Sequence, residues 1–393
     1  MSRLWDQGAP LDARVLAYTA GEDHLLDARL VPYDVRASLA HAEMLAAQGL
    51  LAADDLAAVR GGLTALADEH ARGEWEIELA DEDGHTALER RLGERIGPAA
   101  GRVHLGRSRN DQVLAALRLY LKDAIAELAG RARAVAGALG ALAAAHPGLA
   151  LPGYTHFQRA MPSSVELWAG GFAAALEDDA QGLAGCLRRV DRNPLGSAAG
   201  YGTPGLAIDR EATRAALGFA ASEEPVTAVQ LARGKAEAQL LFETALLQGD
   251  LGRLSADIVL FATSEFGFVE LPDEVTTGSS IMPQKRNPDL YELARGGAAT
   301  ALAALVEVLT IPMKLPSGYH RDLQLVKAPL FRAIDLALAT CDLFAATLPR
   351  LRFRPDRIAL GPELAAAEEA NRLAVEEGIP FREAYRRVAA RYR

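Results

Sequence analysis

Residues 277–289 hold the side chains of this sequence that are best suited to chemistry. The segment reads Thr-Gly-Ser-Ser-Ile-Met-Pro-Gln-Lys-Arg-Asn-Pro-Asp, and Ser279, Lys285 and Asn287 are among its polar residues. Gly278 frees the backbone and two prolines remove backbone donors, so the segment cannot be a packed helix. Unpaired amides beside the two serines could form a nest for an anion. We therefore expect a mobile loop that grips a carboxylate.

A second polar block, residues 104–112, stands at the start of a long apolar pattern. It contains Ser108, Arg109 and Asn110, and two arginines in the block are suited to bidentate binding of a carboxylate. A helix cap would need only one or two of these side chains. A capping cluster and a substrate site both remain open at this point.

Three further polar groups lie where helical patterns begin. His85 and Glu89 are one helical turn apart, and such a pair is often only a solvated contact. The other two groups, residues 154–158 and 319–327, carry Thr155, His156, Tyr319, Gln324 and Lys327. A histidine that caps a helix and a solvated turn are the plain alternatives for them.

The rarity of lysine in this chain strengthens the case that the 277–289 segment has a chemical role. The chain has 5 lysines against 37 arginines, yet Lys285 and Lys327 both fall in the polar segments. An ammonium group is a compact point charge that a guanidinium cannot mimic. This favours a chemical role for Lys285, with coincidence as the alternative.

Long helices must position these groups. Apolar residues recur at spacings of three and four without interruption in several stretches, namely residues 112–146, 163–190, 228–263 and 290–311. The first would extend about 50 Å, so we expect helices of an elongated bundle in a homo-oligomer. The predicted class is all-α with a few short hairpins. It comprises a central long-helix domain (106–350) between smaller helical domains (1–105 and 351–393).

Composition excludes several kinds of partner. The net charge of −10 argues against nucleic acid and anionic membranes, so the partner is a small molecule. Cys186 and Cys341 are far apart, which excludes a disulfide framework and a zinc cluster and suits a reducing cytoplasm. Residues 1–6 show no targeting segment, and prolines interrupt the longest uncharged stretch, 134–158. We therefore expect no membrane span.

Several motifs together resemble a known family. Residues 278–287 resemble the signature loop of the fumarase/aspartase superfamily. Within that superfamily, the chain resembles the argininosuccinate lyases at residues 104–112, 154–158 and 265–269, and at Asp289, Glu292 and Leu293. The resemblance implies reversible elimination of fumarate from argininosuccinate to give arginine, the last step of arginine biosynthesis. It also implies a cytoplasmic homotetramer with shared active sites and neither metal nor organic cofactor.

The resemblance further implies residue roles. Ser279 would be the base, although a neutral hydroxyl is a poor one unless amides and Lys285 stabilise its alkoxide. Lys285 would also stabilise the aci-carboxylate, and His156, oriented by Glu292, would be the general acid or a proton relay. The implied substrate-binding residues are His85, Ser108, Arg109, Asn110, Thr155, Asn287, Tyr319, Gln324 and Lys327.

Two departures from the family pattern leave alternatives open. The early substrate-contacting segment, with its serine and asparagine, is not recognisable in residues 17–29, and residues 193–202 differ from the commonest form. An acylated argininosuccinate is therefore an alternative substrate. Another fumarate-releasing lyase, acting on adenylosuccinate, aspartate or malate, is a second alternative. A catalytically inactive structural homologue is a third, and the intact Ser279, Lys285 and His156 argue against it.

Overall fold

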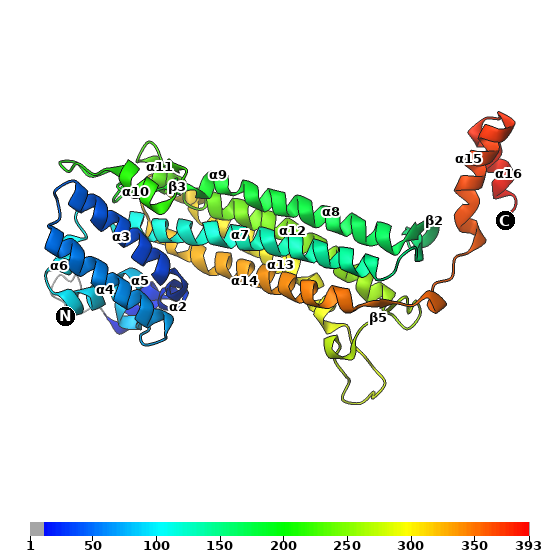
Figure 1. Ribbon diagram of the computed structural model, residues 1–393, viewed down its shortest axis with the longest axis horizontal. Helices are drawn as coiled ribbons and strands as arrows, with labels where there is room; N and C mark the ends of the chain where they lie inside the picture. The colour runs from blue at the N-terminus through cyan, green and yellow to red at the C-terminus, as the bar shows by residue number, and fades with distance from the viewer. Residues whose placement is uncertain (1–11, 393) are drawn as a thin grey trace. The chain divides into compact units, whose positions relative to one another are not determined.

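A computed structural model describes residues 12–392 of the chain (Figure 1). The first six residues, where we predict no targeting segment, lie outside the described part. Helices dominate and the strands are short, which confirms the predicted all-α class. The chain forms two compact units, and the predicted division into three domains stays a prediction. The first unit contains Met1–Glu127, Leu183–Phe242 and Leu302–Ile334, and the second contains Leu128–Gly182, Glu243–Ala301 and Asp335–Arg393.

The first unit is built from short helices and one small sheet. Its α-helices are α1 (Ala13–Ala20), α2 (Asp23–Leu26), α3 (Val31–Ala47), α4 (Ala53–Ala71), α5 (Gly84–Ile96), α6 (Ala99–Arg102), α9 (Leu187–Val190), α10 (Arg210–Leu217) and α11 (Ala228–Leu231). Short 3-10 helices are η1 (Asp27–Leu30), η2 (Leu79–Asp81), η4 (Pro312–Lys314) and η5 (Arg321–Val326). Strands β3 (Arg192–Asn193) and β4 (Ala221–Ser222) pair in parallel.

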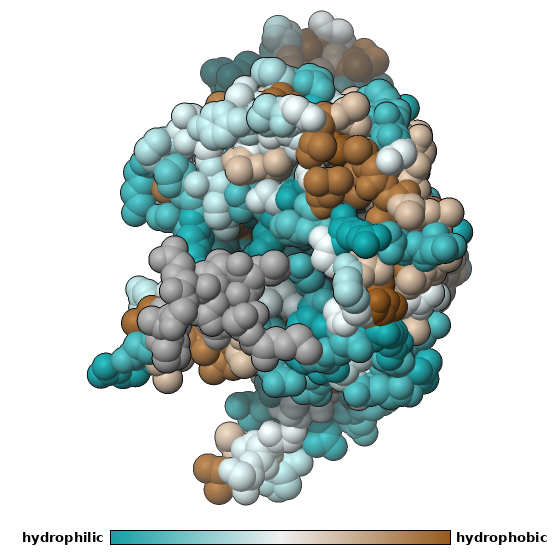
Figure 2. Space-filling model, turned by 90° about the vertical axis from the view of Figure 1, so that its left-hand side faces the viewer, coloured by the Kyte–Doolittle hydropathy of each residue, from teal (hydrophilic) through white to brown (hydrophobic). Residues whose placement is uncertain are grey.

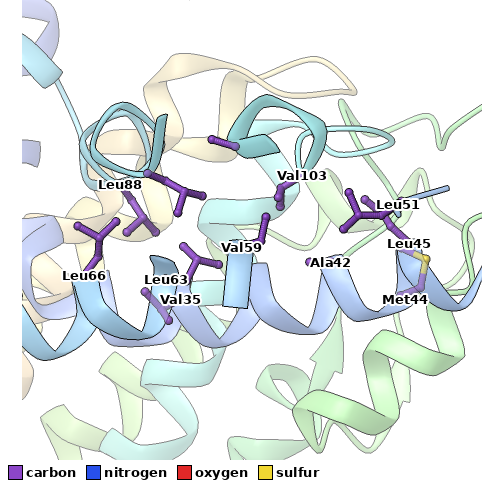
Figure 3. Packing of buried hydrophobic residues seen from close by; sticks show 12 residues of the cluster. Val35, Ala42, Met44, Leu45, Leu51, Val59, Leu63, Leu66, Leu88 and Val103 are labelled. Carbon is purple, nitrogen blue, oxygen red and sulfur yellow. The ribbon is translucent and has the colours of Figure 1, made fainter. Parts of the chain in front are cut away.

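The core of the first unit explains how these helices hold together. Apolar side chains of α3, α4 and α5 interdigitate in one buried cluster, and Figure 3 shows Val35, Leu45, Leu63 and Leu88 pointing into it. Each such side chain stabilises the fold by about 1.5–3 kcal/mol when fully buried. The cluster therefore fixes α5, which carries His85 at its first turn.

Within residues 12–392, five long helices contribute residues to both units, and one of them is α8 (Val165–Gly185). The other four are α7 (Arg109–Ala144), α12 (Lys235–Phe261), α13 (Asp289–Thr310) and α14 (Lys327–Thr347). These helices confirm the prediction that we made from the spacing of apolar residues. The prediction of one continuous helix over 228–263 is wrong, because the helix is interrupted between Leu231 and Lys235. Gly234 has a φ of +83°, and a Cβ there would lie 2.8 Å from Cγ of Pro312, so only glycine fits the break.

The second unit contains segments of the five long helices, most of α8 among them, together with short strands and helices. Strands β1 (Ala150–Thr155) and β2 (Gln158–Ser164) form an antiparallel hairpin, and β5 (Val269–Glu270) pairs with β6 (Arg352–Phe353). The remaining elements are η3 (Asp273–Val275), η6 (Leu348–Arg350), η7 (Pro355–Arg357), η8 (Pro362–Ala365), α15 (Ala366–Glu377) and α16 (Phe381–Ala389). The predicted helix 163–190 therefore begins at Val165, because its first residues belong to the hairpin.

Polar and aromatic contacts tie the helices of the second unit to one another. Nε1 of Trp168 on α8 donates to Asp257 on α12 at 2.9 Å, and the hydroxyls of Tyr291 on α13 and Thr347 on α14 lie 3.1 Å apart. The ring of Trp168 also packs against Phe261. These contacts hold the ends of α8 and α13, next to which the hairpin and the 277–289 segment emerge.

Candidate active site

Side chains from separate stretches of the first unit line one cavity of about 390 Å³. It brings together these predicted site residues: His85, Ser108, Arg109, Asn110, Tyr319, Gln324 and Lys327. Its lining also includes residues absent from the predicted set: Asp23, Asp27, Asp83, His104, Val113, Arg233 and Arg321. Carboxylate, imidazole and guanidinium groups therefore face the same space. Such a lining suits a small ligand that carries charges of both signs.

His85 is held by a carboxylate that is distant in sequence. Its Nδ1 lies 2.6 Å from Oδ2 of Asp34 on α3, and both side chains are buried. Nε2 of Gln112 also donates to Asp34, at 2.8 Å. Burial alone would lower the pKa of His85 and raise that of Asp34, but their attraction outweighs burial and shifts both pKa values the other way. The pairing therefore favours the protonated form of His85. This buried contact with Asp34 replaces the solvated contact with Glu89 that we considered from the sequence.

The start of α7 is fixed by reciprocal capping. The amide of Asn110 donates to Oγ of Ser108 at 3.3 Å, while the amide of Ser108 donates to Oδ1 of Asp111 at 3.0 Å. Oδ2 of Asp111 also accepts the amides of Gly196 and Ala198, and burial raises the pKa of this carboxyl to about 6. The capping interpretation is therefore confirmed, and because Ser108 also lines the cavity, the substrate site stays a prediction for the same block.

Lys327 lies in the cavity wall with its ammonium already paired. Nζ lies 2.5 Å from Oδ1 of Asp27 and 2.9 Å from Oδ2 of Asp23, and the side chain is 3% exposed. Burial would lower the pKa of Lys327, but the two carboxylates outweigh it and raise the pKa. The aspartates lie four residues apart, so they share one face of α2 and η1. That spacing is the signal from which they could have been found in the sequence.

Gln324 and Arg321 close the same side of the cavity. Nε of Arg321 donates to Oε1 of Gln324 at 3.2 Å, and Nε2 of Gln324 donates to the carbonyl of Thr19 at 3.0 Å. Nη2 of Arg321 also reaches Glu82 at 3.1 Å. The turn before α14 is thus anchored to the N-terminal helices of its own unit, which places Tyr319 and Gln324 at the cavity.

The 277–289 segment forms a closed loop in the second unit. Thr277 and Asn287 exchange backbone hydrogen bonds of 3.1 and 2.8 Å at its base, and Nδ2 of Asn287 donates to the carbonyl of Gly278. Oγ of Ser279 accepts the amides of Ile281 at 3.4 Å and Met282 at 3.2 Å. Two amides therefore donate to the Ser279 oxygen, so they are not unpaired as the nest interpretation assumed, and the binding of an anion stays a prediction.

His156 occupies the tip of the β1–β2 hairpin. His156 and Phe157 have φ values of 53° and 58°, which is the backbone of a two-residue turn with both residues left-handed. Both side chains are exposed, and Phe157 is 83% exposed. This backbone is unusual for residues other than Gly, Asn or Asp, so the turn holds the imidazole outward at some cost in strain.

The remaining predicted residues of the second unit are also exposed. Lys285 lies at the tip of the loop and Glu292 in the first turn of α13. In the described part of the chain no hydrogen bond joins His156 to Glu292, so their pairing stays a prediction. The cavity lining of the first unit includes none of the predicted residues of the second, namely Thr155, His156, Ser279, Lys285, Asn287 and Glu292.

Helix α13 carries an uncovered apolar surface. By length and composition alone, the segment Asp289–Lys314 is the one described helix that could cross a membrane, and 22% of its apolar window is buried. Leu293, Leu302 and Val306 are more than half exposed. The face of the molecule drawn in Figure 2 is, by contrast, mostly hydrophilic, with hydrophobic residues gathered in a few patches. Such an apolar surface normally marks an interface.

Known sequences match nearly the whole chain. A family model described as "Lyase" matches residues 10–302. The argininosuccinate lyase of Sorangium cellulosum (strain So ce56) is 48% identical, over 99% of this chain and 90% of that protein. The argininosuccinate lyase of Xylella fastidiosa (strain Temecula1 / ATCC 700964) is 44% identical, over 98% of this chain and 87% of that protein.

Solved structures agree with these sequence matches. An EDDS lyase in complex with formate superimposes with a TM-score of 0.81 at 27% identity, covering 97% of this chain and 76% of that chain. A class II fumarase from Schistosoma mansoni, at 18% identity, shares the fold with a TM-score of 0.77, covering 97% of this chain and 93% of that chain. The fold and these matches together identify a lyase of the fumarase/aspartase superfamily. Within it, the chain belongs to the argininosuccinate lyase family, which confirms the predicted resemblance.

Proposed function

We propose that this chain eliminates fumarate reversibly from argininosuccinate to give arginine, as a carbon–nitrogen lyase in the last step of arginine biosynthesis. The identity of 48% to an argininosuccinate lyase over 99% of the chain carries the proposal. The cavity of the first unit supports it, because argininosuccinate carries several carboxylates together with an ammonium and a guanidinium group. The relatives give no support to adenylosuccinate, aspartate or malate as substrate.

The 277–289 loop supplies the base in this proposal. Ser279 removes the proton beside one succinyl carboxylate, and the amides of Ile281 and Met282 stabilise the oxygen before it takes that proton. Lys285 stabilises the charge that develops on the carboxylate. The carbon–nitrogen bond then breaks, its electrons leave with the guanidinium nitrogen, and His156, oriented by Glu292, returns a proton directly or by relay.

The other predicted residues hold the substrate. Ser108, Arg109 and Asn110 offer hydroxyl, guanidinium and amide donors on one turn of α7 and bind the succinyl carboxylates. Thr155 and Asn287 add to this set from the hairpin and the loop. At the opposite end, Tyr319, Gln324 and Lys327 contact the amino-acid part, and the charged His85 adds a positive field to the cavity. These roles follow the family resemblance.

A cytoplasmic homotetramer with shared active sites completes the proposal. The exposed apolar side chains of α13 and the exposed His156 and Phe157 support it, because a partner subunit would cover them. A second copy of the same chain offers the same long apolar helices. Covering α13 in this way also leaves no need for a membrane around it.

Fumarate release tests the proposed reaction. Purified protein is incubated separately with argininosuccinate, Nα-acetyl-argininosuccinate, adenylosuccinate, aspartate and malate, and fumarate is followed by its ultraviolet absorbance. We expect fumarate from argininosuccinate and none from the last three. Absence of fumarate from argininosuccinate would overturn the proposal.

Mixing two inactive variants tests the shared site. Ser279→Ala changes only the loop and Asn110→Ala changes only the cavity, so each homotetramer should be nearly inactive. If different subunits supply the two residues, dissociating and reassembling a mixture restores part of the activity. Mixing without dissociation is the control. Failure of reassembled mixtures to regain activity would place both residues of each site on one chain.

A further inference from the structure

The charges around Lys327 do not balance. Asp23 and Asp27 both face its single ammonium, which leaves one negative charge in the wall of the cavity. Asp27 uses both oxygens, since Oδ2 also accepts the amide of Gly84 at 3.1 Å. Asp23 pairs through Oδ2, while within residues 12–392 its Oδ1 has no hydrogen bond. The nearby Asp83 is matched by Arg109, so the excess charge belongs to Asp23.

Arg233 places a positive charge in the wall of the same cavity. Its side chain is 5% exposed and lines the same cavity, yet its Nη1 has no hydrogen-bond partner among the described residues. The break before Gly234 places it there, at the point where a continuous helix was predicted. The guanidinium lies 5.8 Å from the centre of the Tyr319 ring. A buried donor without a partner costs about 1–3 kcal/mol, so Arg233 is poised for an acceptor from a ligand.

We propose that Asp23 and Arg233 bind the free α-amino acid end of the substrate, Asp23 the ammonium and Arg233 the carboxylate. This inference rests on the proposed function and narrows its substrate class to argininosuccinate with an unmodified α-amino group. Acylation turns that ammonium into a neutral amide with one N–H, so Oδ1 of Asp23 loses its charged partner. The departure from the family pattern at residues 17–29 then reflects a carboxylate at position 23 that selects the free amine.

Two variants test separately how the α-ammonium and the α-carboxylate of the substrate are recognised. Asp23→Asn removes the charge at constant shape, and we expect kcat/KM for argininosuccinate to fall about tenfold to a hundredfold, mainly through KM. The kcat/KM for Nα-acetyl-argininosuccinate should stay constant or rise, so the preference collapses. Arg233→Gln should lower kcat/KM for both substrates alike, because both retain the carboxylate. Asp356→Asn, an exposed aspartate paired with Arg354, is the matched control.

A binding measurement makes the result independent of turnover. Calorimetric titration of the unmodified enzyme should rank L-arginine above Nα-acetyl-L-arginine and above agmatine, which lacks the carboxylate. Asp23→Asn should abolish the first preference and Arg233→Gln the second. Circular dichroism of each variant checks that it is folded, and Asp23→Ser provides a second probe of position 23.

The outcomes distinguish this inference from the proposed function. If fumarate is released from argininosuccinate but Asp23→Asn and Asp23→Ser keep the full preference for the free amine, the inference is wrong and the function stands. If no fumarate appears while L-arginine binds with both preferences, the function is wrong and the recognition stands. Equal losses for free and acetylated substrates in Asp23→Asn would also overturn the role of Asp23.

Discussion

Nδ1 of His85 and Oδ2 of Asp34 lie 2.6 Å apart in the interior of the first unit, although 51 residues separate them in the chain. The pair joins α5 to α3 and holds the imidazole of His85 in the wall of the cavity. Nε2 of His85 has no hydrogen-bond partner among the described residues, so the second nitrogen of the ring remains available.

Asp34→Asn should destabilise the protein by about 3 kcal/mol, because it leaves a buried imidazolium without its counter-charge. The folded-state pKa of His85 is above its usual 6.5. Its contribution to the free energy of unfolding is therefore full below pH 6.5 and is lost as pH rises through the higher, folded-state pKa. The pKa of Asp34 is below 3.8, so its contribution is present above pH 3.8. Urea unfolding should therefore show the largest difference between these pH values. Glu89→Gln is the control, and a larger loss there would mean that Glu89 is the important partner.

Ser279→Ala should lower kcat about 10²- to 10⁴-fold, since it removes the proposed base and leaves the loop backbone unchanged. The melting temperature should not move. Ser280→Ala, an exposed neighbour on the same loop, should retain normal turnover. Near-normal activity of Ser279→Ala would exclude Ser279 as the base.

His156→Asn should reduce kcat about 10²-fold or more without loss of the hairpin. Asparagine tolerates the positive φ of this turn but cannot transfer a proton at neutral pH. Phe157→Asn tests the same turn with the imidazole intact and should have a much smaller effect on kcat. Equal effects of the two substitutions would point to the turn conformation rather than the imidazole.

Asp179→Asn should stabilise the protein at pH 8 by about 1 kcal/mol, with part of the effect screened by solvent, and should change little at pH 4. Burial, and then Asp250, Asp178 and Glu243, raise the pKa of Asp179 to about 7. The native state therefore holds a proton that the unfolded chain releases near pH 3.8, and stability falls as pH rises between the two values. Thermal unfolding of the unsubstituted protein and of Asp179→Asn across this pH range measures the difference in stability. A difference that does not depend on pH would contradict the raised pKa of Asp179.

Sequence periodicity predicted the long helices closely and missed breaks within two of them, at Cys186 and before Gly234. The pattern at 112–146 corresponds to α7, which begins three residues earlier because Ser108 and Asp111 cap it, and 290–311 corresponds to α13. Periodicity does not register the break before Gly234, because apolar spacing continues across it. A positive φ and the approach of Pro312 decide that position, and both depend on tertiary structure.

Within the site, residue types were predictable and their pairings were not. Hydrogen-bonding side chains concentrated in short segments identified the α7 cap and the Ser279 loop, since local backbone geometry creates both. The partner of His85 comes from α3, and the partners of Lys327 come from α2 and η1. Nothing in a linear pattern indicates which distant carboxylate will meet which cation. Arg233 escaped notice because it was placed inside a predicted helix.

Leu293 on α13 is 78% exposed in the single chain, within a helix apolar enough to match the composition of a membrane span. In the proposed homotetramer, a subunit that separates from its partners would expose this surface to water again, so dissociation would promote aggregation. The unfolding temperature and the active lifetime of the enzyme consequently become functions of its own concentration. Diluting the protein, with no change of temperature or pH, shortens its useful life.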